Sequence, residues 1–404
     1  MMEYIRFKDV TLSTQYGYTA DETSKKEGTY KYLRITDIVP YFVNFDMVPF
    51  CSIPPSKVKQ YLVSEGDILI ARTGATTGYN YVVQKGVKNA VYASYLIRFN
   101  VDKSKVLPSY MKYVLKSNYY YGFVNNYIGG SAQPGMNARV FGRFNIPNNS
   151  LPKQHRIASI LSAYDNLIEN NNKRIRLLEQ MAENLYKEWF VRFRFPGHKN
   201  AEFENGLPKG WRYFELGDRY DITIGKTPPR KEFQWFTQND ISAQNWMSIS
   251  DMKDMFTGNT SEQLTKEAIQ RFNMVVVPEK TILLSFKLTV GRITIATQPL
   301  CTNEAIAHIK NVPEDEHEFL YQQLKNYEYA KLGNTSAIGN AVNSKIIKRM
   351  EVLLPNEDII LRFHKKVYPI FEQIKLLSSQ NETLARQRDL LLPRLMSGKL
   401  EVNV

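Results

Sequence analysis

The chain has 404 residues, of which 43% are hydrophobic. This length allows two or three domains that each bury a core, and it argues against a single compact domain. Its 53 lysines and arginines outnumber its 40 aspartates and glutamates, and no single run of residues carries the resulting net charge of +13. A basic excess of this kind favours a polyanionic partner.

Cysteine and histidine usage argues against a disulfide framework and a metal site. Cys51 and Cys301 lie 250 positions apart, and the five histidines show no ligand spacing with them or with one another. We therefore expect no bound metal and a reducing cytoplasm. The first residues, MMEYIRFKDV, carry charges where a signal peptide needs an apolar run, and no window of 18 apolar residues occurs. These features predict a cytoplasmic protein with no membrane partner.

In chain order, five segments are expected: a globular segment, a long helix, a linker, a second globular segment and a second long helix. Their predicted bounds are 1–150, 151–195, 196–210, 211–354 and 355–404. Both globular segments indicate mixed α/β structure, because short apolar runs alternate with turn residues. Strands are expected at 67–71, 81–83, 95–99, 274–277 and 281–286, and helices at 108–118 and 315–331.

The chain repeats itself. At a shift of 206 residues, Ile157 falls on Phe363, Leu178 on Leu384 and Asn137 on Asn343. Earlier in each half the shift drifts to between 208 and 214, where GDILIARTGATTG (66–78) meets KTILLSFKLTVG (280–291). The predicted fold class is α+β, with two similar mixed α/β domains separated by two long antiparallel, coiled-coil-like helices in a pseudo-twofold internal repeat.

Each long helix carries an apolar stripe with a spacing of 3.5 residues. In the first helix, nine of the ten stripe positions are apolar or aromatic, and the exception is Asn171; in the second helix the exceptions are Asn381 and Arg388. Packing the helices antiparallel about their centres places Asn171 opposite Asn381, a polar pair that would set the register. Pro393 is expected to kink or end the second helix early.

Motifs that carry chemistry are missing. IGKTPP (224–229) resembles the end of a phosphate-binding loop, but Tyr220 stands where that motif needs glycine and two prolines follow. RTGATTG (72–78) fits a tight hairpin loop better than a dinucleotide fingerprint. The sequence contains no metalloprotease motif, nucleophile elbow or amino-methyltransferase tetrapeptide. We therefore predict no catalytic residues, although an unrecognised enzyme acting on a nucleotide stays open as an alternative.

Four segments together resemble the specificity subunit of a Type I restriction-modification enzyme. They are LPKQHRIASILSAYDNLIENNNKRIRLLEQMAENLYKEWF (151–190), GLPKGW (206–211), GDILIARTG (66–74) and LLLPRLMSGKLEV (390–402). The resemblance spans essentially the whole chain. The second helix departs from the family pattern, because NEDIILRFH lacks the glutamine typical near that position and LLSSQNE replaces the Asn-rich run of the first helix.

The resemblance implies that residues 1–150 and 211–354 are target recognition domains, each reading one part of a split, asymmetric site in double-stranded DNA. The helices at 151–195 and 355–404 would be spacers that dock two methyltransferase subunits. Those subunits would bind S-adenosylmethionine and modify adenine N6, so this chain itself would hold no cofactor. A nuclease/translocase subunit would join for restriction.

Candidate DNA-binding residues lie in the loops of the two halves, where Asn and Gln suit adenine and Arg suits guanine. They are Arg72, Thr73, Thr76, Thr77, Tyr79, Asn80, Gln133, Asn137, Arg139, Lys226, Arg230, Lys231, Gln234, Lys287, Thr289, Arg292, Asn340, Asn343 and Lys345. A solvated loop side chain or a turn-forming Asn explains any single one of them equally well. Asn137 and Asn343 match between the halves, which favours a shared loop shape over base reading.

An alternative function is that of a stand-alone architectural DNA-binding protein without a methyltransferase partner. The segment AENLYKEWFVRFRF (182–195) argues for a partner, because it carries more apolar side chains than a two-helix seam needs. We accordingly predict partner docking at Tyr186, Trp189 and Phe190.

Overall fold

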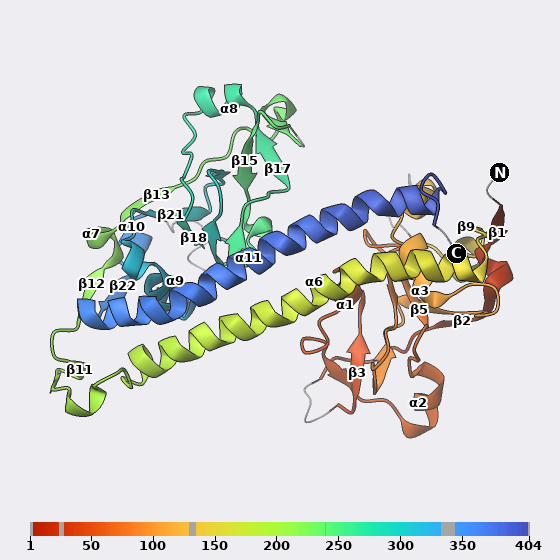
Figure 1. The fold of residues 1–404 in the computed structure, drawn as a ribbon, viewed down its shortest axis with the longest axis horizontal. Helices are drawn as coiled ribbons and strands as arrows, with labels where there is room; N and C mark the ends of the chain where they lie inside the picture. Colours follow the sequence, from red (N-terminus) through yellow and green to blue (C-terminus); the bar gives the residue numbers. More distant parts are fainter. Residues whose placement is uncertain (1–2, 24–27, 129–134, 239, 333–343, 403–404) are drawn as a thin grey trace. The chain divides into compact units, whose positions relative to one another are not determined.

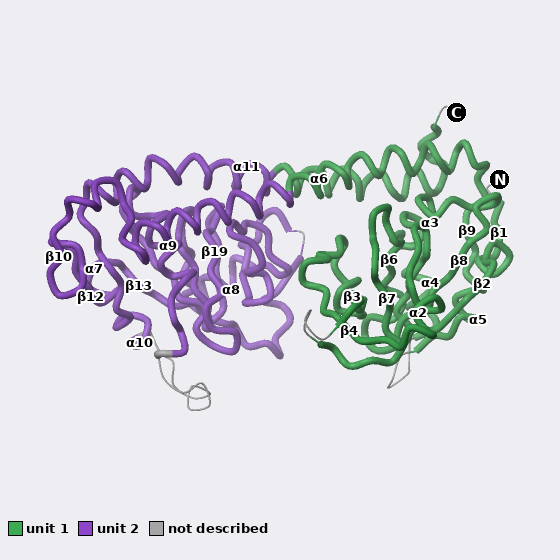
Figure 2. The backbone as a smooth tube through the Cα atoms, turned by 90° about the horizontal axis from the view of Figure 1, so that it is seen from below, with its two compact units in different colours: residues 1–171, 380–404 green, residues 172–379 purple. Residues whose placement is uncertain are grey.

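Two compact units make up the chain (Figure 2). The computed structural model describes residues 3–23, 28–128, 135–238, 240–332 and 344–402. Unit 1 comprises residues 1–171 and 380–404, and unit 2 comprises residues 172–379. Each unit therefore contains one globular segment together with a stretch of each long helix.

Unit 1 is built on an antiparallel four-stranded sheet in the order β2-β8-β5-β6. A second sheet, β4-β3-β7, pairs β3 with β7 in parallel, and β1 pairs with β9. The strands are β1 (Tyr4–Arg6), β2 (Thr11–Tyr16), β3 (Tyr30–Leu33), β4 (Phe50–Cys51), β5 (Ile68–Ala71), β6 (Asn80–Val82), β7 (Ala90–Tyr92), β8 (Leu96–Val101) and β9 (Asn145–Pro147). All four residues of β5 are buried, as expected for a short, wholly apolar strand.

Short α-helices accompany these sheets in unit 1. They are α1 (Ile35–Ile38), α2 (Pro55–Tyr61), α3 (Pro108–Val114), α4 (Asn118–Ile128) and α5 (Ala138–Phe141). The residues Tyr110, Met111 and Val114 of α3 are buried in the main core, together with Phe99 of β8.

Unit 2 repeats this plan. Its main sheet has the order β13-β21-β18-β19-β16, and its second sheet, β14-β17-β15-β20, again contains one parallel pair, β15 with β20. The strands are β10 (Phe203–Glu204), β11 (Leu207–Pro208), β12 (Arg212–Glu215), β13 (Asp221–Ile224), β14 (Phe236–Thr237), β15 (Gln244–Met247), β16 (Phe256–Thr257), β17 (Glu262–Leu264), β18 (Ile282–Ser285), β19 (Ile293–Ala296), β20 (Cys301–Thr302), β21 (Ile306–Lys310) and β22 (Glu351–Leu354). The strands β13, β21, β18 and β19 take the places of β2, β8, β5 and β6, and the β12–β22 pair takes that of β1–β9.

The short helices of unit 2 are α7 (Leu216–Arg219), α8 (Lys266–Arg271), α9 (His317–Lys325) and α10 (Ser344–Lys348). Helix α9 follows β21 as α3 follows β8, and it buries Phe319, Leu320, Tyr321 and Leu324 in the core. The internal repeat found in the sequence is therefore a repeat of topology as well.

The two long helices are α6 (Leu151–Tyr186), which a π-helical turn at Lys187–Val191 extends, and α11 (Glu357–Met396). They run antiparallel and side by side within each unit (Figure 1). In unit 1 the Asn171 Nδ2 atom donates a hydrogen bond to Asn381 Oδ1 over 3.0 Å. In unit 2 the ring centroids of Trp189 and Phe363 lie 5.8 Å apart.

Gln154 ties the beginning of α6 to unit 1. Its side chain is buried, its Oε1 accepts a hydrogen bond from Leu107 N over 2.8 Å, and its Nε2 donates to Lys105 O and Asn149 O. At the shift of 206 residues, Ile360 stands at this place in α11 and is also buried. The second helix therefore replaces a hydrogen-bonded anchor with an apolar one.

Two local expectations were wrong. Helix α11 continues through Pro393 to Met396, and Leu395 is buried. A proline removes a single backbone donor, and burial of Leu392, Leu395 and Met396 in the core of unit 1 stabilises this last turn. The segment 274–277 forms no strand beyond an isolated bridge between Val277 and Leu300, because it lies between a turn at Asn273 (φ 48°) and Pro278, which lacks an N–H donor.

The predicted docking residues Tyr186, Trp189 and Phe190 are a third correction. They are 6%, 5% and 3% exposed and belong to the core of unit 2. The Phe190 ring lies 4.6 Å from that of Phe319 and 5.0 Å from that of Phe363. The apolar surplus on α6 arises because the helix packs against the globular segment as well as against α11, so these side chains are unavailable to a partner.

Replacing Phe190 by alanine should lower the free energy of unfolding by about 3–5 kcal/mol, because it leaves a cavity among aromatic rings. The neighbouring Val191 is 58% exposed, so Val191→Ala should change stability by no more than about 0.5 kcal/mol. Urea unfolding followed by circular dichroism compares the two variants. Equal effects would show that Phe190 does not contribute to the core.

Candidate nucleic-acid interface

Most of the described candidate residues of the first half lie on the loop that joins β5 to β6 or at its end. The Arg72 guanidinium lies 5.1 Å from the centre of the Tyr16 ring, and its Nε donates to Ser94 O over 3.3 Å. Thr73, Thr76 and Tyr79 lie on the same loop. Arg72 is thus held between an aromatic face and a backbone carbonyl, which limits the positions that its charge can take.

Gly78 closes this loop. It has a φ of 91°, and a Cβ placed on it would lie 2.8 Å from Val124 Cγ1, so only glycine fits. Its carbonyl accepts hydrogen bonds from the Tyr120 hydroxyl over 3.0 Å and from Asn80 Nδ2 over 3.1 Å. The backbone at the end of this loop is therefore held in place by the conformation of Gly78 and by the hydrogen bonds to its carbonyl oxygen.

Thr77 and Asn80, both predicted to bind DNA, are corrected by their burial. The Thr77 side chain is buried, and its Oγ1 donates to Gly74 O over 2.8 Å. Asn80 is also buried, and its Nδ2 donates to Leu115 O over 2.7 Å. Both side chains stabilise the loop from inside, and the composition of RTGATTGYN does not distinguish this role from base contact.

A second predicted segment joins the same loop. Met136 N donates to Arg72 O over 2.9 Å, and Thr73 forms an isolated bridge with Gly135. Asn137 caps α5, because its Oδ1 accepts a hydrogen bond from Val140 N over 3.0 Å. This contact fits the shared loop shape expected for Asn137, whereas Arg139 is exposed. Gln133 lies outside the described residues.

The second of these segments, at 137–139, borders a concave surface of about 640 Å³ along the edge strand β2. Lys8, Ser13, Thr14 and Tyr16 line it together with Arg139. Sequence analysis missed the first four, since single polar residues on a strand do not identify the face that they share. The surface presents two cations, hydroxyl groups and an aromatic ring, which are groups that contact phosphates and base edges.

The loop between β18 and β19 is the counterpart in unit 2. Gly291 has a φ of 89°, and a Cβ there would lie 2.8 Å from the Tyr329 ring, which matches the arrangement of Gly78 against Val124. Lys287, with its Nζ 5.7 Å from the centre of the Phe286 ring, and the exposed Thr289 flank the exposed Leu288. Arg292 donates to Ile249 O over 3.0 Å. The same scaffold thus presents different side chains in the two units.

Arg230 is held by more contacts than the other candidates discussed for unit 2. Its guanidinium donates to both carboxylate oxygens of Glu262 over 2.7 and 2.9 Å and lies 4.6 Å from the Phe236 ring and 4.5 Å from the Trp246 ring. Lys226 Nζ donates to Asn273 O over 2.9 Å. Lys231, Gln234 and Lys345 are exposed, whereas Asn340 and Asn343 lie outside the described residues.

Some buried titratable groups lie in strands of the two units. His308 lies in β21 with its Nδ1 3.0 Å from Thr223 Oγ1 and its Nε2 2.7 Å from Thr302 Oγ1. Burial lowers the pKa of His308 to about 4, and burial raises the pKa values of Cys51 and Cys301 to about 11 and 12. Among the residues that the structure describes, no three His, Cys, Asp or Glu side chains could together hold a metal ion.

Within the described ranges, no helix is both long enough and apolar enough to cross a bilayer.

Stability should fall as the pH falls from 7 to 5, because His308 stays neutral in the folded chain while the unfolded chain takes up a proton near pH 6.5. Because the pKa of His308 in the folded chain is about 4, this residue should lower the free energy of unfolding by on the order of 2 kcal/mol between pH 7 and pH 5. Urea unfolding at both pH values should show a smaller difference for His308→Gln. An unchanged pH dependence in that variant would contradict a buried neutral imidazole.

Comparison with known sequences covers most of the chain. Residues 2–180 and 208–384 match the family described as the Type I restriction modification DNA specificity domain. The specificity subunit of the Type I restriction enzyme MjaIX from Methanocaldococcus jannaschii is 27% identical over 350 residues, which are 84% of this chain and 78% of that protein. The HindI specificity subunit from Haemophilus influenzae is 26% identical over 86% of this chain and 89% of its own length.

A solved structure shares the fold. The S subunit of a Type I restriction-modification system from M. genitalium aligns with 98% of this chain and 96% of its own at a TM-score of 0.56 and 14% sequence identity.

Proposed function

Because the chain belongs to the family of Type I restriction modification DNA specificity domains, we propose that it is the non-catalytic subunit that reads a bipartite, asymmetric DNA sequence. Unit 1 would contact one part of the site and unit 2 the other. Methyltransferase subunits would carry S-adenosylmethionine and modify adenine N6, and a nuclease/translocase subunit would act on unmodified DNA. This work would take place in the cytoplasm, where the DNA lies.

One observation carries this proposal: the same glycine-closed hairpin loop occurs in each unit with unlike side chains. Gly78 and Gly291 hold equivalent turns, while one loop carries Arg72 and Thr73 and the other carries Lys287 and Leu288. A shared backbone would present the loops to DNA in the same way. Different side chains would then select different bases, so the two parts of the site would differ.

Charge would position the DNA before any base is read. In unit 1, Lys8 and Arg139 flank the concave surface beside β2, and phosphate contacts from such cations give affinity without sequence preference. In unit 2, Arg230 is held by Glu262 and two rings. A fixed guanidinium loses little side-chain entropy when it binds, which suits the bidentate reading of guanine.

We propose modification-sensitive sequencing of host DNA as the test, with the gene present and deleted. Loss of N6-methyladenine from one split, asymmetric motif is the expected result. Complementation with Arg139→Gln should lower methylation at that motif, whereas Arg143→Gln, which changes an exposed arginine outside the concave surface, should restore it.

An unchanged methylome after gene deletion would contradict the specificity function. A direct DNA-binding assay would then test the alternative of a stand-alone architectural protein.

Docking of a methyltransferase subunit needs exposed apolar side chains on the helices. Leu177 and Met181 lie one turn apart on α6 within unit 2 and are 61% and 56% exposed. We propose this pair as docking residues in place of the buried Tyr186, Trp189 and Phe190.

The variant Leu177→Asp, Met181→Asp should lose copurification with the methyltransferase subunit, because it places two carboxylates in an apolar contact. Met47→Asp, which changes a 75% exposed side chain in a loop of unit 1, is the matched control. Undiminished copurification of the double variant would exclude this face of α6.

A further inference from the structure

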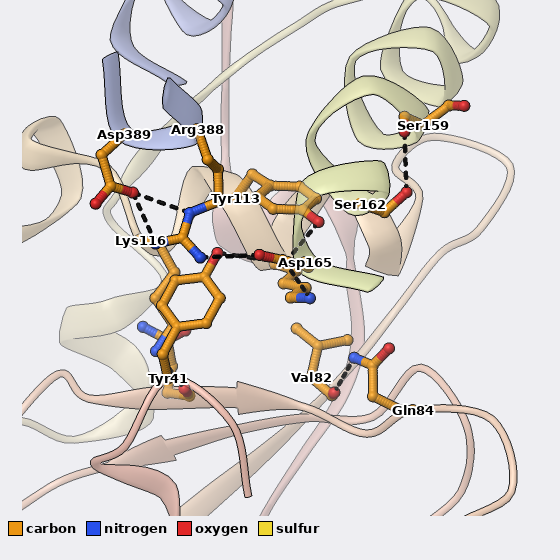
Figure 3. Close-up of polar contacts among 12 residues, drawn as sticks. Tyr41, Val82, Gln84, Tyr113, Lys116, Ser159, Ser162, Asp165, Arg388 and Asp389 are labelled. Atoms are coloured by element: carbon orange, nitrogen blue, oxygen red, sulfur yellow. Dashed lines mark hydrogen bonds and ion pairs between the residues drawn. The ribbon is translucent and has the colours of Figure 1, made fainter. Parts of the chain in front are cut away.

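A buried polar cluster crosses the helix pair in unit 1 (Figure 3). Arg388 of α11 forms an ion pair with Asp165 of α6, with its Nη1 atom 2.9 Å from Asp165 Oδ1, and the two side chains are 7% and 2% exposed. The other oxygen of Asp165 contacts Lys112 Nζ at 2.5 Å and accepts a hydrogen bond from the Tyr113 hydroxyl over 2.8 Å. The Arg388 guanidinium also stacks on the Tyr41 ring at 3.8 Å.

The repeat assigns a counterpart to each member of the ion pair. At the shift of 206 residues, Asp165 corresponds to Phe371 and Arg388 corresponds to Ala182. Both counterparts are buried in the apolar core of unit 2, where the Tyr321 ring of α9 packs edge-on against Phe371 at 5.5 Å. The same place in the helix pair is therefore charged in unit 1 and apolar in unit 2.

The hydrogen-bonded asparagines differ in the same way. Asn171 corresponds to Leu377 and Asn381 corresponds to Ile175. Leu377 is buried, and Ile175 packs against the core of unit 2. The Asp165–Arg388 and Asn171–Asn381 contacts thus form two polar layers between the helices of unit 1, and the equivalent layers of unit 2 are apolar.

This difference matters because the repeat offers a second way to pair the helices. Since α6 and α11 carry equivalent stripes, α6 of one copy could pack against α6 of a second copy, and α11 against α11. Asp165 would then face Ala182, Arg388 would face Phe371, and each asparagine would face an aliphatic side chain. Asp165 would keep Lys112, but Arg388 would keep only the 61% exposed Asp389. A buried guanidinium that loses its buried carboxylate is unfavourable, and so is a buried amide opposite a hydrocarbon.

We propose that the Asp165–Arg388 and Asn171–Asn381 layers select the helix partner. They make α6 pack against α11 and exclude like-with-like pairing between two copies of the chain. Polar residues at single seam positions set partner and register in this way, at some cost in stability. The layers do not distinguish α6–α11 pairing within one chain from the same pairing between two chains. Pairing within one chain is favoured there because the two helices belong to the same molecule.

Moving the arginine tests this partner choice. In the full-length variant Ala182→Arg, Arg388→Ala, pairing within one chain separates Asp165 from the moved arginine. Pairing α6 with α6 of a second copy instead places each Asp165 opposite the arginine introduced at position 182 of the other chain. Light scattering should therefore report twice the molar mass of the wild-type chain. Adding Asp165→Phe and Phe371→Asp moves the ion pair into unit 2 and should restore the monomer.

A folded monomer of Ala182→Arg, Arg388→Ala, judged by circular dichroism, would overturn the proposal. If that variant does not fold, two differently tagged chains, one with Asp165→Arg and one with Arg388→Asp, give the second test. Co-expressed, they should copurify in equal amounts, because exchanging helices restores an opposite-charge pair at both places.

Exposed positions on the same helices provide the control for this exchange. Chains with Glu169→Arg and with Arg386→Asp make the same kind of charge reversal outside the buried layer, and they should not copurify. Separate purification of the chains altered at Asp165 and Arg388 would also overturn the proposal.

Discussion

The antiparallel contact between α6 and α11 is the constraint on which both units depend. Neither globular segment completes its main core alone. The core of unit 1 includes Ile157 and Leu161 from α6 with Leu392 and Leu395 from α11, and the core of unit 2 includes Ala182 and Phe190 with Phe363 and Phe371. The helices are therefore parts of two cores rather than a separate element. Because each core takes residues from both helices, a shift of their register by one turn would disturb the packing in both units.

Sequence reasoning succeeded where a signal was spread over many residues. The spacing of 3.5 residues and the shift of 206 residues each depend on many positions, and the topology of the two units reproduces the repeat. Even the level at which Asn171 meets Asn381 followed from centring one stripe on the other. Such patterns survive because no single tertiary contact can override them.

Sequence reasoning failed where the surroundings of a residue depend on a segment that is distant in the sequence. Phe190 carries the same pattern whether it faces a partner or the ring of Phe319, and Asn80 can face DNA or the carbonyl of Leu115 with equal ease. Asp165 is the strongest example, because it lies beside the apolar stripe and is buried among Lys112 and Tyr113 of α3, Tyr41 and Arg388. Identifying those contacts requires the distances between elements, which composition and spacing do not contain.

In both units the backbone of the hairpin loop and its side chains have separate roles. Backbone positions with no freedom, such as Gly78 and Gly291, hold the hairpins, and the loop side chains bring charge and hydrogen-bonding groups to the surface. This separation allows the loop residues to change without disturbing the core. It also explains how one scaffold can occur twice in a chain with different surface chemistry.

The discontinuity of unit 1 has a consequence for the order of folding during synthesis. Residues 1–171 leave the ribosome first, yet their core is completed by Leu392, Leu395 and Met396, whereas unit 2 is one continuous stretch of chain. The nascent protein therefore carries an unfinished apolar surface for the time needed to translate more than 200 further residues. Aggregation through this surface before synthesis is complete is therefore a risk that comes with a discontinuous unit.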